Sequence, residues 1–251
     1  MSDKQDKNFG FEKVTSDKKR SLIDKVFSDV AGKYDLMNDL TSLGIHRLWK
    51  DEFCTMIPNL NSTILDVAGG TGDISFRLHA NGKKQNKEPH IVVCDINPEM
   101  LGICRDRAIN NNILKKFEIV VGDGEKLPFA DNVFDYYTIA FGIRNMISIE
   151  NALKEAYRVL KPTGKFLCLE FSKVENDMMR SLYHLYSFNL IPLIGNLVTE
   201  NEEAYKYLAE SISLFPNQND FKIMIESAGF SNVNYKNLTF GVAAIHSGFK
   251  S

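Results

Sequence analysis

The chain has 251 residues, 44% of them hydrophobic and 25% charged, and its formal net charge is -2 at pH 7. This length suffices for one large α/β domain or two small ones, and either would bury an ample core. Charges of both signs are spread along the chain, without the basic stripe that a phosphate backbone requires. Composition therefore argues against nucleic acid as a partner.

Cysteine use and the amino-terminal sequence bear on location. Cys54, Cys94, Cys104 and Cys168 form no CxxC pair, and two of them lie in apolar runs where a thiol is a small buried hydrophobe. The start MSDKQDKNFGFEK lacks the apolar core of a signal peptide, and no stretch approaches the ~20 apolar residues of a membrane span. We therefore expect a cytoplasmic protein without a metal site, which at most lies on the inner face of a membrane.

The first part of the chain is expected to be a flexible segment followed by helices. Residues 1–20 are polar, mixed in charge and without period. From Ser21 to Ile57 apolar residues recur at helical spacing, with one group around Phe27 and another around Phe53. Pro58 ends this helical preface.

Between residues 64 and 172 short apolar runs typical of strands alternate with helical ones. The strand-like runs are ILDV, HIVVCD, FEIVVGD, FDYYTIAFG and GKFLCLEFS, and the helical runs are DISFRLHA, PEMLGICRDRAI and IENALKEAYRVL. This alternation predicts an α/β fold with a doubly wound, mostly parallel sheet, in which ligands bind at the carboxyl ends of the strands. Motifs at those ends are therefore expected to share one crevice.

Beyond Lys173 the alternation stops. A helical lid or insert is expected over residues 176–213, and a further helix over residues 219–227. The closing runs FSNVNYKNL and GVAAIHSGF are near enough in sequence to pair as an antiparallel hairpin. We therefore expect residues 21–251 to form a single domain.

The stretch TILDVAGGTGDISF contains a glycine loop with an acid on each side, Asp66 and Asp73. Gly70-x-Gly72 is half of a dinucleotide fingerprint, and Asp95 lies about 20 residues downstream, where a ribose-binding acid belongs. The third glycine of that fingerprint is missing. A pyrophosphate would bring two negative charges to a helix N-terminus that two carboxylates already flank. The loop therefore favours a ligand without phosphate.

S-adenosylmethionine meets this requirement, because it carries a sulfonium and an ammonium beside a single carboxylate. We expect Asp66 to orient loop amides and to meet the ammonium, while the glycines let backbone approach the methionyl part. Asp95, at the end of HIVVCD, is expected to accept both ribose hydroxyls. Asp123 ends the next strand and is expected to accept from the adenine amino group. Three acids at three successive strand ends form a joint pattern that indicates one binding site.

Each acid also has a structural explanation. Asp66 and Asp73 can cap the helix that follows the loop, and Asp95 can begin the turn before Asn97. Asp123 and the following glycine form a common turn dipeptide. The binding interpretation depends on their occurrence together.

Two groups of motifs carry a family resemblance. The pattern DxAxGxG from Asp66, followed by CDIN, GDGEKLPF and RVLKPTGKF, resembles the motif series of class I methyltransferases that use S-adenosylmethionine. YDLMNDLTSLGIHRLW, FGIRN and RVLKPTGKFLCLEFS are similar to the signatures of the ubiquinone/menaquinone biosynthesis C-methyltransferase family. This resemblance extends from about Val26 to Phe249 and covers nearly the whole chain.

The resemblance implies a Rossmann-like class I methyltransferase fold and the donor S-adenosyl-L-methionine. The implied acceptor is a ring carbon of a polyprenylated benzoquinol (2-methoxy-6-polyprenyl-1,4-benzoquinol), of demethylmenaquinol, or of both. By position, the implied cofactor contacts are Thr71, Asp95, Asp123 and Gly124. The glycine loop adds a further set, namely Asp66, Gly70 and Gly72.

The sequence departs from the family at three positions. Ala140 stands where a serine is common near the cofactor, so no contact through that hydroxyl exists here. Thr163 replaces a glycine in KPTG, which puts the usual tight turn in doubt. Gly124 replaces a frequent alanine, a change that backbone contacts tolerate.

TIAFGIRNM places Arg144 and Asn145 just past an apolar strand, at the rim where the methyl group is expected to point. A guanidinium with a pKa above ~12 is not free to accept a proton. We therefore expect Arg144 to stabilise a developing phenolate, directly or through a water that acts as base, with Asn145 orienting that water or a ring oxygen. The alternative is that Arg144 pairs with Glu170 and ties strands together. Tyr34 and His46 are further candidates to face the substrate, although His46 also fits a helix-turn position of the lid.

LYSFNLIPLIGNLV, residues 185–198, is too short and too broken by proline and glycine to span a bilayer. It fits an apolar lid, a membrane-facing edge or ordinary core packing. The substrate interpretation makes a lipid-tailed quinol the partner, with peripheral membrane contact. A homodimer and a place in a quinone-biosynthesis complex both stay open.

Two rival functions are weighed against methyl transfer. A nicotinamide oxidoreductase on a similar sheet would bind NAD(P), and the acids around Gly70 argue against that ligand. A non-catalytic cofactor-binding subunit of a quinone-biosynthesis complex would have no physical need for the loop, the three acids and FGIRN together.

Overall fold

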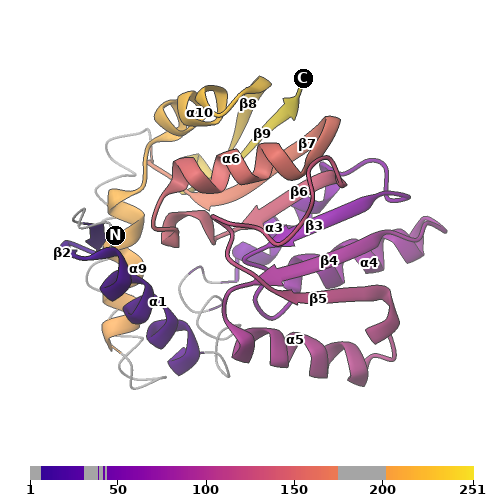
Figure 1. The fold of residues 1–251 in the computed structure, drawn as a ribbon, viewed down its shortest axis with the longest axis horizontal. Coiled ribbons are helices and arrows are strands. Elements are labelled where there is room, and N and C mark those ends of the chain that lie inside the picture. Colours follow the sequence, from indigo (N-terminus) through magenta and orange to yellow (C-terminus); the bar gives the residue numbers. More distant parts are fainter. Residues whose placement is uncertain (1–6, 31–38, 40–41, 43, 175–201) are drawn as a thin grey trace.

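The computed structural model describes residues 7–30, 39, 42, 44–174 and 202–251. A central sheet runs through the molecule with helices on both of its faces (Figure 1). Helices α1 (Ser16–Val30) and α9 (Glu202–Leu214) pack beside each other beyond the carboxyl ends of the parallel strands. These two helices therefore cover the edge at which ligands bind in α/β sheets.

Seven strands form the sheet in the order β5-β4-β3-β6-β7-β9-β8. Their bounds are Phe117–Val121 (β5), His90–Asp95 (β4), Thr63–Val67 (β3), Phe134–Ala140 (β6), Leu160–Phe171 (β7), Ala243–Lys250 (β9) and Phe230–Leu238 (β8). The first five in this order are parallel, whereas β9 is antiparallel to both of its neighbours. The predicted parallel sheet with a closing antiparallel hairpin is confirmed, and its strand order reverses between β3 and β6.

The remaining helices are α3 (His46–Thr55), α4 (Asp73–Lys84), α5 (Pro98–Asn110), α6 (Ile149–Val159) and α10 (Gln218–Ser227). Capping residues in the sequence fix the N-termini of several of these helices. The Asn97 side chain accepts hydrogen bonds from the amides of Glu99 and Met100, and Pro98 occupies the first turn of α5. Ser148 caps α6 in the same way. The helix predicted over residues 219–227 is α10.

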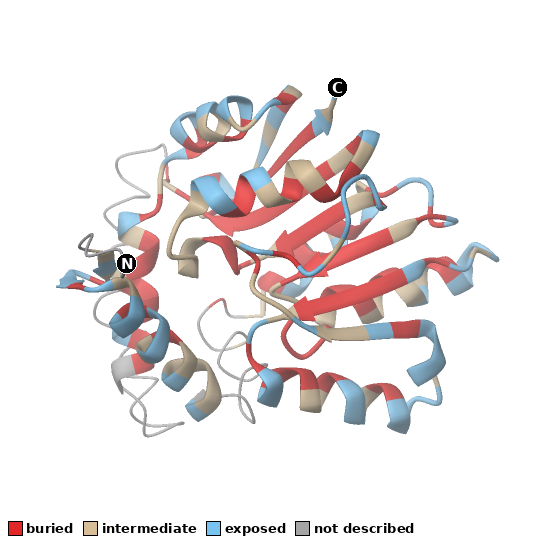
Figure 2. Ribbon diagram, in the orientation of Figure 1, coloured by how far each residue is buried: buried red, intermediate tan, exposed pale blue. Residues whose placement is uncertain are grey.

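Each central strand is buried on both faces (Figure 2). Successive side chains of β3 point to opposite layers, because strand side chains alternate. Ile64 joins a core with Trp49 and Phe53 of α3, whereas Leu65 joins a second core with Leu153 of α6. The continuous apolar character of these strands follows from this double cover.

The amino-terminal part differs from the sequence expectation. Residues 7–14 form a hairpin of β1 (Lys7–Phe9) and β2 (Glu12–Val14), and α1 begins at Ser16. The amide of Phe11 donates to Glu210 Oε2 of α9 at 3.0 Å, so the hairpin is fixed by a contact 199 residues away. A local pattern of polar residues cannot show such a contact.

Two further sequence expectations concern turns and inserts. Thr163, which replaces a glycine, adopts a left-handed φ of 66°. The tight turn is therefore present, although a threonine disfavours this backbone conformation. The predicted insert over residues 176–213 is described only from residue 202, where α9 begins; residues 185–198 and Tyr34 lie outside the described residues. None of the described helices is long and apolar enough to cross a membrane.

Candidate active site

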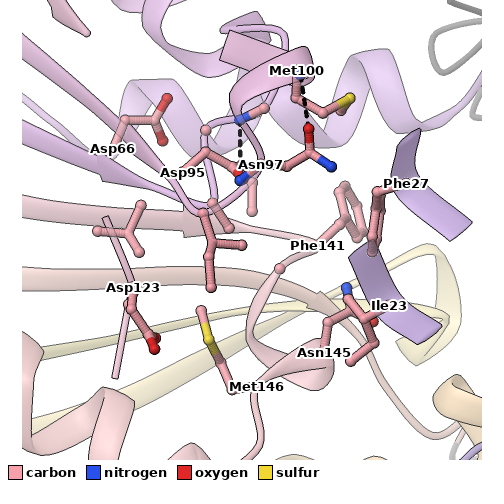
Figure 3. Close-up of a pocket in the computed structure, with 18 of the residues that line it drawn as sticks. Ile23, Phe27, Asp66, Asp95, Asn97, Met100, Asp123, Phe141, Asn145 and Met146 are labelled. Atoms are coloured by element: carbon pink, nitrogen blue, oxygen red, sulfur yellow. Dashed lines mark hydrogen bonds between the residues drawn. The ribbon is translucent and has the colours of Figure 1, made fainter. Parts of the chain in front are cut away.

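A cavity lies at the carboxyl ends of β3, β4, β5 and β6 and holds about 1120 Å³ of space not filled by atoms, part of it open to solvent. Figure 3 shows the strand-end acids on one side of it and Ile23 and Phe27 of α1 on the other. Seven of the nine residues assigned to catalysis or cofactor binding from the sequence line this cavity, and Gly72 and Arg144 do not. The set is Asp66, Gly70, Thr71, Asp95, Asp123, Gly124 and Asn145.

The glycine loop between β3 and α4 turns sharply, with positive φ at Ala68, Gly70 and Gly72. The Gly70 amide donates to Asp95 Oδ2 at 2.8 Å, which ties the loop to the end of β4. A Cβ at Gly72 would lie 2.6 Å from the sulfur of Cys104. Gly72 therefore serves close packing of the loop against α5 and does not line the cavity.

Asp66 is buried at the base of the loop, with 1% of its surface exposed. It accepts hydrogen bonds from Ser75 Oγ at 2.6 Å and from Thr138 Oγ1 at 3.0 Å, and burial raises its pKa to about 6. The neighbouring Asp73 instead pairs with Lys50 Nζ at 2.8 Å. Asp66 thus supports the first turn of α4, as its structural explanation requires, and also reaches the cavity.

Asp95 and Asp123 are held by the backbone of their own turns. Asp95 Oδ1 accepts from the Asn97 amide at 2.9 Å, and burial raises the pKa of Asp95. Asp123 Oδ1 accepts from the Glu125 amide at 2.9 Å, and its other oxygen lies 2.8 Å from Nη1 of Arg20 in α1. Both acids make the predicted turns and also line the cavity, so the two explanations hold together.

The two residues predicted to act in catalysis both lie in the short helix η3 (Ile143–Asn145), but they line different cavities. Asn145 lines the cavity and accepts a hydrogen bond on Oδ1 from the hydroxyl of Tyr207 at 3.0 Å. Arg144 instead lines a second cavity, which lies between η3, the amino-terminal hairpin and α9.

Arg144 forms the pair with Glu170 that the sequence left as an alternative. Its Nη1 lies 2.9 Å from Glu170 Oε1, and the two side chains are 6% and 1% exposed. Burial raises the pKa of Glu170, and the guanidinium opposes this rise. Arg144 Nε is buried and has no hydrogen-bond partner in the part of the chain that the structure describes, so one donor remains uncommitted there.

His46 begins α3, and its Nε2 lies 2.8 Å from Asp39 Oδ1; it does not line the cavity. The sequence analysis did not assign Arg20, Ile23 or Tyr207 to the site. Ile23 and Phe27 stand four residues apart, a helical spacing that indicates a common face but not what the face covers. Arg20 and Tyr207 have no local signal, because their partners lie on distant segments.

The fold and the cavity together define the class. A glycine loop after the first parallel strand, acids at three strand ends and an antiparallel closing strand are the features of a class I S-adenosylmethionine-dependent methyltransferase. A SAM-dependent methyltransferase from Thermotoga maritima superposes with a TM-score of 0.61 at 18% identity, over 90% of this chain and 99% of that chain. A SAM-dependent methyltransferase from Aquifex aeolicus gives 0.56 at 19% identity, over 85% and 93%.

A third solved structure, phosphoethanolamine N-methyltransferase 2 of Haemonchus contortus in complex with S-adenosyl-L-methionine, gives a TM-score of 0.54 at 14% identity, over 75% of this chain and 48% of that chain. At these identities the structural likeness shows the fold alone.

Sequence comparison is more specific. Residues 13–250 match the ubiE/COQ5 methyltransferase family. The ubiquinone/menaquinone biosynthesis C-methyltransferases UbiE of Rickettsia bellii (strain OSU 85-389) and Rickettsia prowazekii (strain Madrid E) are each 57% identical over 243 residues, which cover 97% of this chain and 98% of theirs. This chain therefore belongs to the ubiE/COQ5 methyltransferase family. It is a methyltransferase that uses S-adenosyl-L-methionine, and neither the nicotinamide oxidoreductase nor the non-catalytic subunit is supported.

Proposed function

We propose that this protein transfers a methyl group from S-adenosylmethionine to a ring carbon of a polyprenylated quinol, either 2-methoxy-6-polyprenyl-1,4-benzoquinol, demethylmenaquinol or both. The observation that carries the proposal is one cavity that joins the strand-end acids of the donor site to Asn145 in a chain of this family. The relatives that are 57% identical bear the name of this activity.

The cavity fits the donor by charge and by space. S-adenosylmethionine supplies an electrophilic methyl group when it is bound. Asp66 would face its ammonium, Asp95 its ribose hydroxyls and Asp123 its adenine amino group, while the loop presents backbone at Gly70. A Cβ at Gly70 would lie 3.1 Å from Met100 Cε, so a side chain there would compete for space beside the donor site.

The acceptor carbon of a quinol is a weak nucleophile until an adjacent hydroxyl ionises. The enzyme must therefore favour the phenolate, align the carbon with the methyl group and exclude water. Holding the two reactants in line can remove roughly 7 kcal/mol of the barrier. Helix α1, with Ile23 and Phe27 over the cavity, provides the apolar wall that keeps water out.

Asn145 and Arg144 would both stabilise the phenolate, each in a different way. Asn145 lines the cavity and would orient the ring oxygen or a water that accepts the proton. Arg144 is held by Glu170, lines the second cavity and would supply positive charge from there, with its Nε donor acting through that water. Because a guanidinium does not give up its proton, it acts as an electrostatic group and not as the base.

Turnover of Arg144→Gln tests this role. We expect kcat to fall about 100-fold while the affinity for S-adenosylmethionine stays unchanged. The double variant Arg144→Gln/Glu170→Gln removes the unpaired buried carboxylate that would otherwise destabilise the fold. Wild-type turnover in a variant that melts like the wild type would reject the catalytic role of Arg144.

The proposed activity is tested by incubating the protein with S-adenosylmethionine labelled in its methyl group and with each quinol head group. Mass analysis should find the label on a ring carbon of at least one of them. An Asp95→Ala variant, with a weakened donor site, serves as the negative control. Label on oxygen, or no transfer to either quinol, would contradict the proposal.

We further propose that the protein works peripherally on the inner face of the membrane, because a polyprenyl tail partitions into lipid. It would act there as a homodimer or within a quinone-biosynthesis complex. Flotation with liposomes, with and without quinone lipid, tests the membrane contact. Protein that stays with the soluble fraction in both cases would reject it.

A further inference from the structure

We propose that Tyr207 of α9 is a positioning residue for this reaction: its hydroxyl fixes the side-chain amide of Asn145 so that the NH₂ group faces the acceptor oxygen. This inference rests on the proposed function. It adds a residue to the reaction that does not touch the substrate and acts through its neighbour.

The hydrogen bond between the two side chains is specific. Tyr207 Oη lies 3.0 Å from Asn145 Oδ1, and the two residues are 62 positions apart. Tyr207 is 6% exposed, and burial raises its pKa to about 12, so the phenol keeps its proton and donates at physiological pH. Asn145 is thereby linked to a helix that packs against the edge of the site.

A primary amide presents an acceptor on one side and two donors on the other. With Oδ1 of Asn145 held by Tyr207, its Nδ2 group is turned the opposite way. A phenolate oxygen in the cavity needs donors, because the charge that develops on it must be stabilised. Rotation of the amide by half a turn would present Oδ1 to that oxygen and repel it. In the structure the hydroxyl of Tyr207 donates to Oδ1 and so holds the amide in the productive orientation.

The amino-terminal hairpin holds Tyr207 from its other side. The rings of Phe9 and Tyr207 stack with their centroids 4.3 Å apart and their planes at 14°. The hairpin is itself bound to α9 through the bond from the Phe11 amide to Glu210. Residues from the start, the middle and the end of the chain thus meet in one unit that orients a single amide.

The matched test compares Tyr207→Phe with Tyr205→Phe. Tyr205 lies on the same helix and is also buried, but its hydroxyl has no hydrogen-bond partner among the described residues. Single-turnover rates are measured with saturating S-adenosylmethionine between pH 6 and 10. We expect Tyr207→Phe to slow methyl transfer about tenfold at neutral pH and to recover at high pH, because the bound quinol then ionises without help. Tyr205→Phe should keep the wild-type rate and profile, and both variants should keep the wild-type donor affinity.

A second measurement needs no substrate. In ¹⁵N-labelled protein the side-chain amide signals of Asn145, assigned by their loss in Asn145→Ala, report the orientation of the group. These signals should shift and broaden in Tyr207→Phe and stay unchanged in Tyr205→Phe. Unchanged Asn145 signals in Tyr207→Phe, or equal rate losses in the two variants, would overturn the inference. Absence of transfer by the wild-type protein would instead count against the proposed function, and the amide signals would still decide the role of Tyr207.

Discussion

The two halves of the cavity are built in different ways. The donor half consists mainly of strand ends and turns bound to nearby backbone: Asp95 accepts from the Gly70 amide of the neighbouring loop, and Asp123 accepts from the amide two residues on and also pairs with Arg20 of α1. The acceptor half depends on a contact between remote segments, that of Tyr207 with Asn145, while the adjacent Arg144 lines the second cavity and pairs with Glu170. In the proposed function the sheet thus builds the donor site mainly from local contacts, whereas α9 and the amino-terminal hairpin contribute to the acceptor site.

The contrast is sharpest within η3. Arg144 and Asn145 are adjacent, yet Arg144 lines the second cavity and Asn145 lines the candidate active-site cavity. A single short helix therefore connects the buried ion pair to the reaction site. Changes in the acceptor half should alter the rate of methyl transfer, whereas changes in the donor half should alter cofactor affinity.

The largest expected effect is on the buried ion pair. Glu170→Ala leaves the Arg144 guanidinium buried without its counter-charge, so we expect the free energy of unfolding to fall by about 3–5 kcal/mol. Urea denaturation measures this loss. Glu118→Ala, which removes a carboxylate that is 62% exposed, is the control and should change stability by less than about 1 kcal/mol. Equal losses in both variants would show that the pair does not anchor η3.

The next effect concerns the donor half and depends on pH. Burial raises the pKa of Asp66 from 3.8 to about 6, so the folded state favours the protonated form. The corresponding stability is fully present below pH 3.8 and is lost as the pH rises through 6, a change of about 3 kcal/mol. Asp66→Asn should remove this dependence, because its side chain does not ionise.

Urea denaturation of both proteins from pH 4 to pH 7 tests the assignment to Asp66. The stability difference between wild type and variant should change across this range, while the contributions of the other acids cancel. The same variant should bind S-adenosylmethionine more weakly, since the carboxylate opposite the ammonium is gone. Parallel curves would place the titration elsewhere.

The smallest of the three effects lies in the glycine loop. Gly72→Ala places a Cβ 2.6 Å from Cys104 Sγ at a φ of 84°, so we expect a loss of about 2 kcal/mol in stability and weaker cofactor binding. Gly102→Ala is the matched control, because Gly102 lies in α5 and a Cβ added there would meet no atom within 4 Å outside the helix's own backbone. It should stabilise the protein by about 0.5–1 kcal/mol, as measured by thermal or urea unfolding. A neutral Gly72→Ala would disprove the packing role.

These differences also explain what could be predicted from the sequence. Strand and helix periods are local, so runs such as HIVVCD predict β4 closely, and acids at successive strand ends indicate a shared site. The amino-terminal hairpin could not be predicted, because the backbone amide of Phe11 at its turn is held by Glu210, 199 residues away. The role of Tyr207 could not be predicted either, because its partner Asn145 is 62 residues away in the sequence.

For two predicted site residues, Gly72 and Arg144, the sequence motif did not determine the role of the side chain. The spacing of the glycine loop assigns Gly72 to the cofactor, yet its missing side chain makes room for Cys104. For Arg144 the sequence offers both a catalytic role and a pair with Glu170, and only the folded structure shows that the pair forms. A motif shows which amino acid stands at a position. The same amino acid can be needed there for packing, for an ion pair or for catalysis, and the motif does not distinguish these roles.

The division between the donor and acceptor halves is the central claim, and comparing Asp95→Ala with Asn145→Ala tests it most directly. Calorimetry gives the Kd for S-adenosylmethionine, and single-turnover kinetics give the rate of methyl transfer from the bound donor. We predict that Asp95→Ala weakens donor binding about 100-fold, whereas Asn145→Ala binds the donor normally and transfers the methyl group about 100-fold more slowly. An Asn145→Ala variant that loses donor affinity but reacts at the wild-type rate once loaded would contradict the account.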